Sequence, residues 1–138
     1  MILSARILEN VSGVNSFSYA NQAAFTEGDT PVIYFQLVDA SQDRPEKGFV
    51  PSGRRFVPAN GALLTVSLGS IDDARKISRL ATQPFANDPS IWAFQVLTTD
   101  KIRGTVNMNL SLNQGGVLTK GQIQAAVAVQ GLDGLSRL

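Results

Sequence analysis

The carboxylates are the first residues of this sequence to consider for chemistry, because the chain contains neither histidine nor cysteine. A Ser-His-Asp triad, a cysteine nucleophile and a zinc–thiolate site are therefore impossible. Asp72 and Asp73 are adjacent and offer a pair of carboxylates for acid–base catalysis. A solvated turn or the first turn of a helix explains this pair better, because anions are favoured at a helix N-terminus.

A second acidic group falls in one polar stretch and consists of Asp39, Asp43 and Glu46. Carboxylate and carbonyl oxygens bind calcium, but the spacing of these residues does not match an EF-hand loop. We interpret the group as part of a surface loop. We therefore expect no catalytic residue, no metal and no cofactor, and we expect that the chain is not an enzyme. A glycosidase that uses only carboxylates stays open as an alternative.

Basic residues form three small clusters, which are Arg54-Arg55, Arg75-Lys76-Arg79 and Lys101-Arg103. Phosphate binding is one role for such clusters. The whole chain, however, has 12 basic and 11 acidic residues and a net charge of +1, whereas nucleic-acid-binding domains are strongly basic. We interpret the clusters as solvated faces or as salt-bridge partners in an interface, and we expect no nucleic-acid partner.

Two aromatic residues, Trp92 and Tyr34, are of the kind that stacks on sugars or bases. Both fall inside strand patterns, so we expect both rings to pack in the core instead. A carbohydrate-binding role depends on at least one of these rings being exposed, and burial of Trp92 weakens it.

Charged residues make up 17% of the chain, which is below the ~25% typical of soluble domains. Two explanations stay open: more of the surface is buried against a partner, or Ser, Thr, Asn and Gln supply the polar surface. No apolar run approaches the ~20 residues of a membrane span, so we expect no membrane partner. The first residues lack the charged and apolar regions of a signal peptide, so we expect no export by that route.

Glycine and proline separate short segments of alternating polarity, which is typical of an all-β fold. Residues 105–113 alternate most clearly and place four apolar side chains on one face. The sequence Asn-Gln-Gly-Gly that follows predicts a turn in which Gly116 has a positive φ angle. Residues 117–130 are predicted as the partner strand of this hairpin, with a bulge at Gly121.

Further strands are predicted from apolar runs and alternation at 3–7, 16–26, 32–38, 62–68, 75–82 and 91–98, with a short extended piece at 56–57. Residues 32–38 are almost continuously apolar, which is typical of a strand buried on both faces. Residues 40–53 are expected to form a long loop. Residues 70–74 resemble a capped helical turn.

A chain of this length is expected to form a single domain over residues 1–138. With about eight strands, we predict an antiparallel two-sheet β-sandwich, because each sheet then buries one face against the other. A small β-barrel is the alternative. Residues 1–30 are either strands of the domain or a partly extended N-terminal arm that grips a neighbour. Residues 131–138 are a C-terminal tail whose leucines, Leu132, Leu135 and Leu138, we expect to pack on a neighbouring subunit.

Four stretches carry a family resemblance: Val-Ile-Tyr-Phe-Gln-Leu-Val-Asp at 32–39, Arg-Arg-Phe-Val-Pro-Ala-Asn-Gly-Ala at 54–62, Gln-Pro-Phe-Ala-Asn-Asp-Pro-Ser-Ile-Trp at 83–92, and Gly-Thr-Val-Asn-Met-Asn-Leu at 104–110. They resemble small virion structural proteins of tailed bacteriophages and, more distantly, the N-terminal β-domain of upper-baseplate proteins. The resemblance covers roughly residues 30–130, and no catalytic residue accompanies it.

The resemblance implies a non-enzymatic structural component of a tailed-phage virion, assembled in the host cytoplasm. Because the chain ends at Leu138, we expect an adaptor or decoration subunit of the tail, baseplate or neck. The expected partners are other virion structural proteins and copies of the chain itself, with no small-molecule substrate. A capsid decoration protein is one alternative. A carbohydrate-binding module of a phage fibre, with Trp92 or Tyr34 as its stacking platform, is another.

Overall fold

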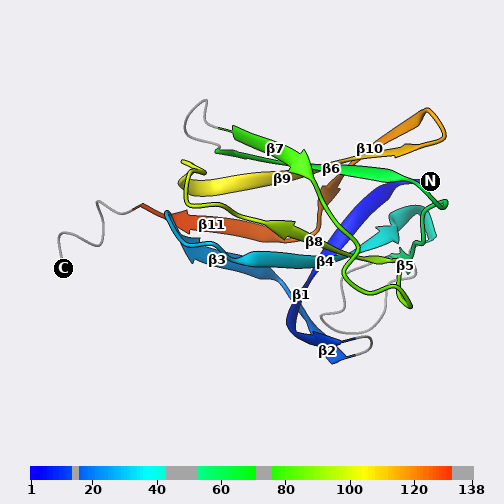
Figure 1. Cartoon of the computed structure of the whole chain (residues 1–138), viewed down its shortest axis with the longest axis horizontal. Helices are drawn as coiled ribbons and strands as arrows, with labels where there is room; N and C mark the ends of the chain where they lie inside the picture. The colour runs from blue at the N-terminus through cyan, green and yellow to red at the C-terminus, as the bar shows by residue number, and fades with distance from the viewer. Residues whose placement is uncertain (14–15, 43–52, 71–75, 132–138) are drawn as a thin grey trace.

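A computed structural model of the chain describes residues 1–13, 16–42, 53–70 and 76–131 (Figure 1). Within these ranges the chain is built from strands, and its one helical element there is the short 3-10 helix Ala40–Gln42. The prediction of an all-β protein is confirmed. The strands are β1 (Leu3–Gly13), β2 (Ser16–Ala20), β3 (Gln22–Thr26), β4 (Val32–Asp39), β5 (Arg54–Arg55), β6 (Leu63–Ser70), β7 (Lys76–Leu80), β8 (Ile91–Gln95), β9 (Gly104–Gln114), β10 (Val117–Ile123) and β11 (Ala126–Gln130).

All eleven strands of the described ranges belong to one hydrogen-bonded sheet, which curls into a half-barrel. The main path through the sheet is β3-β11-β9-β10-β1-β4-β5. Strand β6 pairs with β9 and carries β7, while β2 pairs with β1 and β8 pairs with β4. Figure 1 shows β6, β7, β9 and β10 along one side of the molecule, with β4 and β8 along the other.

Two pairings in this sheet are parallel, β1 with β10 and β3 with β11. The contact of β1 with β10 joins the two sides of the molecule through the backbone. The fold is therefore a curled mixed sheet and is not clearly the predicted antiparallel two-sheet sandwich of about eight strands. Alternation along a strand predicts its buried face but not its neighbour, so both architectures look alike in sequence.

The half-barrel is open between β7 and β8. In the described part of the chain, one isolated bridge crosses this gap, where Thr82 and Ala93 exchange backbone hydrogen bonds of 3.0 and 2.8 Å. The neighbouring Ala81 N–H donates to the carbonyl of Leu64 in β6. The sheet thus curls towards the small β-barrel that was the alternative prediction. It does not close, because no continuous ladder of described residues joins β7 to β8.

The core lies on the inner face of the curled sheet and is filled by side chains from both sides of the molecule. Its largest fully buried members are Phe35, Phe94, Leu37, Leu64, Leu68, Ile102, Leu110 and Leu112. Full burial of each such side chain contributes about 1.5–3 kcal/mol relative to exposure. The apolar positions predicted from alternation in 62–68 and 105–113 point into this core, as expected.

The hairpin predicted at 105–130 is confirmed in its first half, where β9 and β10 pair around a turn with positive φ angles at Gly115 and Gly116. The bulge predicted at Gly121 is wrong, because the register continues without a shift from Thr119 to Gln122. The reason for glycine is steric. A Cβ atom at Gly121 would collide with the carbonyl oxygen of Leu3, because β1 runs close beside β10.

The N-terminal residues of the chain lie inside the sheet. Strand β1 pairs with β4 on one edge and with β10 and β2 on the other, so Leu3–Gly13 is a central strand and not a free arm. Strand β4 is buried on both faces, as predicted. The short extended piece falls at Arg54–Arg55 instead of 56–57. Of the predicted helical turn, Ser70 ends β6 and the rest lies outside the described residues, as does the tail after Gly131.

Candidate functional site

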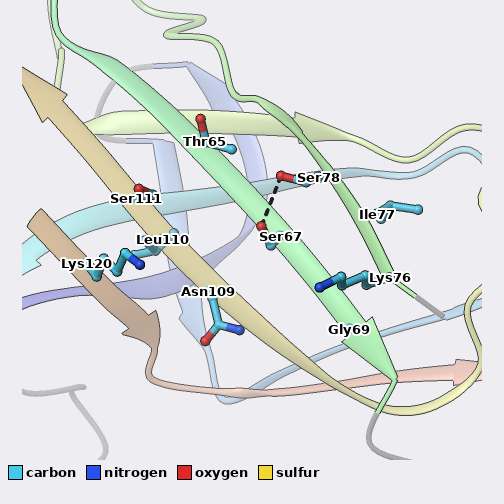
Figure 2. Close-up of a pocket in the computed structure, with 10 residues that line it drawn as sticks. All are labelled: Thr65, Ser67, Gly69, Lys76, Ile77, Ser78, Asn109, Leu110, Ser111 and Lys120. Atoms are coloured by element: carbon cyan, nitrogen blue, oxygen red, sulfur yellow. Dashed lines mark hydrogen bonds between the residues drawn. The ribbon is translucent and has the colours of Figure 1, made fainter. Parts of the chain in front are cut away.

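A groove of about 650 Å³ lies on the outer face of β6, β7, β9 and β10 (Figure 2). Strand alternation creates this face. Leu64, Val66 and Leu68 of β6 point into the core, so the intervening Thr65, Ser67 and Gly69 point outward. Strand β9 obeys the same rule, and its outward positions are threonine, asparagine and serine. Each core-facing strand therefore presents small polar groups to the outside.

The strand registers place these outward side chains in rows across the four strands. The rows are Leu63-Asn113-Leu118, then Leu80-Thr65-Ser111-Lys120, then Ser78-Ser67-Asn109-Gln122, then Lys76-Gly69-Asn107. We call the surface formed by these residues the outer face. Cross-strand neighbours in such rows have Cβ atoms about 4.5–5.5 Å apart, so a ligand or partner meets the rows as one surface.

The groove exists because the middle of the outer face carries only short side chains. Ser67 and Ser78 face each other across β6 and β7, and the Ser67 hydroxyl donates to the Ser78 hydroxyl at 3.1 Å. At Gly69 an added Cβ atom would meet the Cβ of Lys76 at 3.6 Å, an ordinary contact. Glycine at position 69 therefore leaves space that a larger residue would occupy.

The charges of the outer face are of one sign. Lys76 on β7 and Lys120 on β10 lie on opposite sides of the hydroxyl and amide groups (Figure 2). Within the described residues neither lysine forms an ion pair, and the four rows contain no carboxylate. A partner that offers carboxylates is therefore favoured, although salt screens exposed charges beyond about 8 Å at physiological ionic strength.

Exposed leucines gather at one end of the outer face. Leu63, Leu80 and Leu118 are 55%, 54% and 57% exposed. Leu63 and Leu118 flank Asn113 in one row, and Leu80 pairs with Thr65 in the next. Single exposed leucines are ordinary, but three exposed leucines in two adjacent rows beside a polar groove are typical of an interaction surface.

A second polar feature lies on the outward side of β1, β4 and β8. The Gln36 amide is its centre: its oxygen accepts from Arg6 Nε at 3.0 Å, and its nitrogen donates to Ser90 Oγ at 3.2 Å. Ser90 Oγ in turn donates to the Asp88 carboxylate at 2.6 Å. All four side chains are buried. Because the hydrogen bonds of these groups are satisfied inside the chain, the network holds strands together and offers no free group to a ligand.

An ion pair crosses the gap between β7 and β8. Arg79 donates two hydrogen bonds to the buried Asp100 carboxylate, at 2.7 and 2.8 Å, and a third to the Gln95 carbonyl at 2.7 Å. The bonds from Arg79 hold the pKa of Asp100 below its ordinary value, and the same bonds raise the pKa of Arg79. The guanidinium group also lies 5.4 Å from the Phe94 ring centroid. Arg79 thus closes the half-barrel where backbone pairing does not.

The acidic residues singled out in the sequence do not come together as a site. Asp39 accepts hydrogen bonds from Ser41 and from the Ile2 N–H, and the Ser41 hydroxyl is the main cause of its lowered pKa. Asp43, Glu46, Asp72 and Asp73 lie outside the described residues. In the part of the chain that the structure describes, no group of three or more carboxylates could hold a metal ion.

The basic clusters separate into two kinds. Three arginines form ion pairs within the chain: Arg55 with Asp88 at 3.4 Å, Arg79 with Asp100 at 2.7 Å, and Arg103 with Glu27 at 3.2 Å. Lys76 belongs to the outer face, Arg54 and Lys101 are exposed, and Arg75 lies outside the described ranges. These salt bridges lie within the chain, so the predicted salt-bridge role in an interface stays a prediction.

The prediction that Trp92 packs in the core is confirmed, since it is 3% exposed. Its Nε1 atom has no hydrogen-bond partner among the described residues, which is unusual for a buried indole. Tyr34 is half-buried and is not a member of the core cluster, so the same prediction fails for that ring.

Sequence reasoning missed the outer face as a surface. The polar positions of 105–113 were visible, but nothing in the sequence shows that β6 and β10 lie on either side of β9. The low charge content was the available signal, because it implies that Ser, Thr and Asn cover part of the exterior.

No family model, curated protein or solved structure matches the chain. The described residues also include no helix long and apolar enough to span a membrane. The functional argument therefore depends on the geometry of the outer face together with the resemblance carried by the sequence.

Proposed function

We propose that the chain is a non-enzymatic structural subunit of a tailed-phage virion, an adaptor or decoration unit that acts by protein–protein assembly. The observation that carries the proposal is the outer face, where three exposed leucines adjoin a broad groove with two lysines and no carboxylate among its rows. A neighbouring virion protein with apolar and acidic side chains fits this surface. Placement in the tail, baseplate or neck rests on the sequence resemblance.

The chemistry of the groove supports assembly over catalysis. A serine nucleophile needs a base within hydrogen-bond reach. In the described residues, Ser67 bonds to Ser78, and no hydrogen bond joins Lys76 or Lys120 to a groove hydroxyl. The residues that line the groove also include no aromatic ring. Since sugar-binding surfaces stack on such rings, and since Trp92 is buried, the carbohydrate-binding alternative is less favoured than assembly.

Membership in the particle can be tested directly. In a lysate of the phage that encodes the chain, the protein should co-sediment with assembled particles in a density gradient. Tails and heads are then separated and each is assayed for the chain. Recovery with the tails supports the tail component, and recovery with the heads supports the capsid decoration alternative. Recovery of the chain solely at the top of the gradient, with none in either fraction, would contradict the virion assignment.

The role of the outer face is tested by Leu118→Asp. This side chain is exposed, so the fold should tolerate the change, whereas incorporation into particles should fall about tenfold if it loses roughly 1.4 kcal/mol of contact energy. Val117→Asp is the matched control, because Val117 is also exposed and points to the opposite side of the same strand. Equal incorporation of both variants would exclude the outer face as the contact.

A further inference from the structure

Strands β2 and β3 form an exposed border of the sheet that is separate from the gap between β7 and β8. They follow each other in the chain with a bend at Asn21. Within the described residues, each of these strands pairs on one side only, β2 with β1 and β3 with β11. From Ser16 to Thr26 the sequence contains no charged residue and no proline. We call this border the neutral edge.

The backbone hydrogen bonds show which groups of β3 face outward. The Ala126 N–H donates to the Asn21 carbonyl, and the Glu27 N–H donates to the Gln130 carbonyl. In a parallel ladder these two bonds require Ala23 and Phe25 to face β11, because alternate residues bond to the same neighbour. The N–H and C=O groups of Gln22, Ala24 and Thr26 consequently point away from the sheet.

One end of the neutral edge is closed by the chain itself. The Thr26 N–H donates to the Asp29 carboxylate at 3.1 Å, and the Thr26 carbonyl accepts from the Asp29 N–H at 3.0 Å. Gln22 and Ala24 are both exposed, and their outward backbone groups have no partner in the described residues. The edge is therefore open from Ala24 toward β2 and ends at Thr26.

Side chains on both faces of the sheet hold the neutral edge in place. Phe25 packs against the core, and the Tyr19 ring covers the Arg6 guanidinium at 4.6 Å while its hydroxyl donates to Gln36. Phe17 meets the Tyr19 ring edge-on at 5.8 Å. An edge held in this way loses little conformational freedom when another strand pairs with it, which favours binding.

Two other edge strands of the sheet, β7 and β5, carry charges. Strand β7 has Lys76 and Arg79, and β5 consists of Arg54 and Arg55. Proteins commonly protect exposed edges with charge, proline or a bulge, because an unprotected edge pairs with further strands. The neutral edge has no charge or proline to protect it, and the register shift in its ladder with β1 falls between Glu9 and Gly13.

We propose that the neutral edge pairs with the same edge of a second copy of this chain, antiparallel across a twofold axis, so that two sheets become one. Charge compatibility favours a second copy: a twofold contact places each residue type near its own equivalent, and an uncharged edge meets no like-charge repulsion there. A different protein would find no charge pattern on this edge to select it. The surface is separate from the outer face, so this inference does not depend on the proposed function.

The oligomeric state of the purified chain tests the proposal. By light scattering after size exclusion, the wild type should show about twice the 14.8 kDa mass of one chain. Ala24→Lys introduces a charge on the edge and should weaken dimerisation at least about tenfold. Ala24→Pro should do the same, because it removes an outward N–H that the β3–β11 ladder does not use.

Ala128→Lys is the matched control. Ala128 is the exposed cross-strand partner of Ala24, but it lies on β11, between β3 and β9, and is not on the edge. This variant should remain dimeric, and so should Leu118→Asp, which tests the outer face alone.

Hydrogen exchange gives a second measurement. The Gln22 and Ala24 amides should be protected in the dimer and should exchange faster in Ala24→Lys. A wild type that stays monomeric up to roughly 100 µM, or a dimer that all the Ala24 variants retain, would overturn the proposal.

Discussion

Two borders of the same sheet, β7 and the neutral edge, are treated in opposite ways. Strand β7 carries Lys76 and Arg79, and Arg79 reaches across the gap to Asp100 and Gln95. The neutral edge carries neither charge nor proline, and its open backbone groups at Gln22 and Ala24 face outward. The difference teaches that an ion pair closes this half-barrel at one border, whereas outward backbone groups at the other border are unpaired within the described residues.

The largest expected effect comes from the core that supports both borders. Phe25 of β3 and Ile77 of β7 pack against the cluster that contains Trp92. Trp92→Ala should lower the unfolding free energy by about 3–5 kcal/mol, because it leaves a large cavity. Both borders should lose protection from hydrogen exchange together. Loss of exchange protection at one border alone would contradict this prediction, since it would show that β7 and the neutral edge do not share a core.

Trp92→Phe is the matched control for this change. It keeps most of the apolar volume and removes an Nε1–H that has no partner in the described structure. The unfolding free energy should therefore fall by less than about 1.5 kcal/mol. In the wild type, the emission maximum of the buried indole should be shifted to the blue.

A smaller effect is expected from the ion pair that closes the β7 border. Arg79→Ala leaves the buried Asp100 carboxylate without its main partner. The unfolding free energy, measured by urea denaturation, should fall by about 2–3 kcal/mol. This is less than for a fully buried pair, because Arg79 is partly exposed. Lys76→Ala on the same strand should change stability by less than about 0.5 kcal/mol. Equal effects of the two variants would mean that the ion pair does not close the border.

The same ion pair predicts a pH dependence. The pKa of Asp100 is lower in the folded chain than its ordinary value of 3.8, so folding favours the ionised carboxylate. The contribution of the ionised Asp100 to the unfolding free energy is complete when the pH is above the ordinary pKa. It is lost as the pH falls through the lower pKa of the folded chain. Asp100→Asn should therefore be less stable than the wild type at pH 7. The difference in unfolding free energy should narrow below about pH 4. A constant difference down to pH 2 would contradict this assignment.

The smallest effect on stability is expected at the groove beside β7. Gly69→Thr adds atoms to open space on the outer face, and the nearest described contact of its Cβ would be an ordinary one. The unfolding free energy should change by no more than about 0.5 kcal/mol. Incorporation into particles should nevertheless fall, because the added side chain fills the groove. If Gly69→Thr is incorporated as well as the wild type, the groove is not the contact region, and the exposed leucines remain the candidate.

Much of the strand pattern was predictable because burial of one face imposes a period of two. The inward positions of β6 and β9, the glycine turn after β9 and the burial of Trp92 follow from that period and from the conformational freedom of glycine. These are local properties, since each depends on a few neighbouring residues. They are therefore visible in a single sequence.

Strand neighbours were not predictable in this way. The parallel contact of β1 with β10 decides that the sheet curls as one piece, and it also explains Gly121, which the sequence alone suggested was a bulge. Residues 3 and 121 are far apart in the chain, and no local preference records their contact.

The sequence by itself determined the all-β class, the alternation that separates core from exterior, and the exclusion of histidine and cysteine chemistry. Tertiary structure alone decided which polar positions share the outer face, which charge closes the gap between β7 and β8, and which edge stays open. The physical reason is that side-chain alternation is imposed along one strand, whereas rows, ion pairs and edges arise between strands, where pairing depends on the packing of the whole sheet.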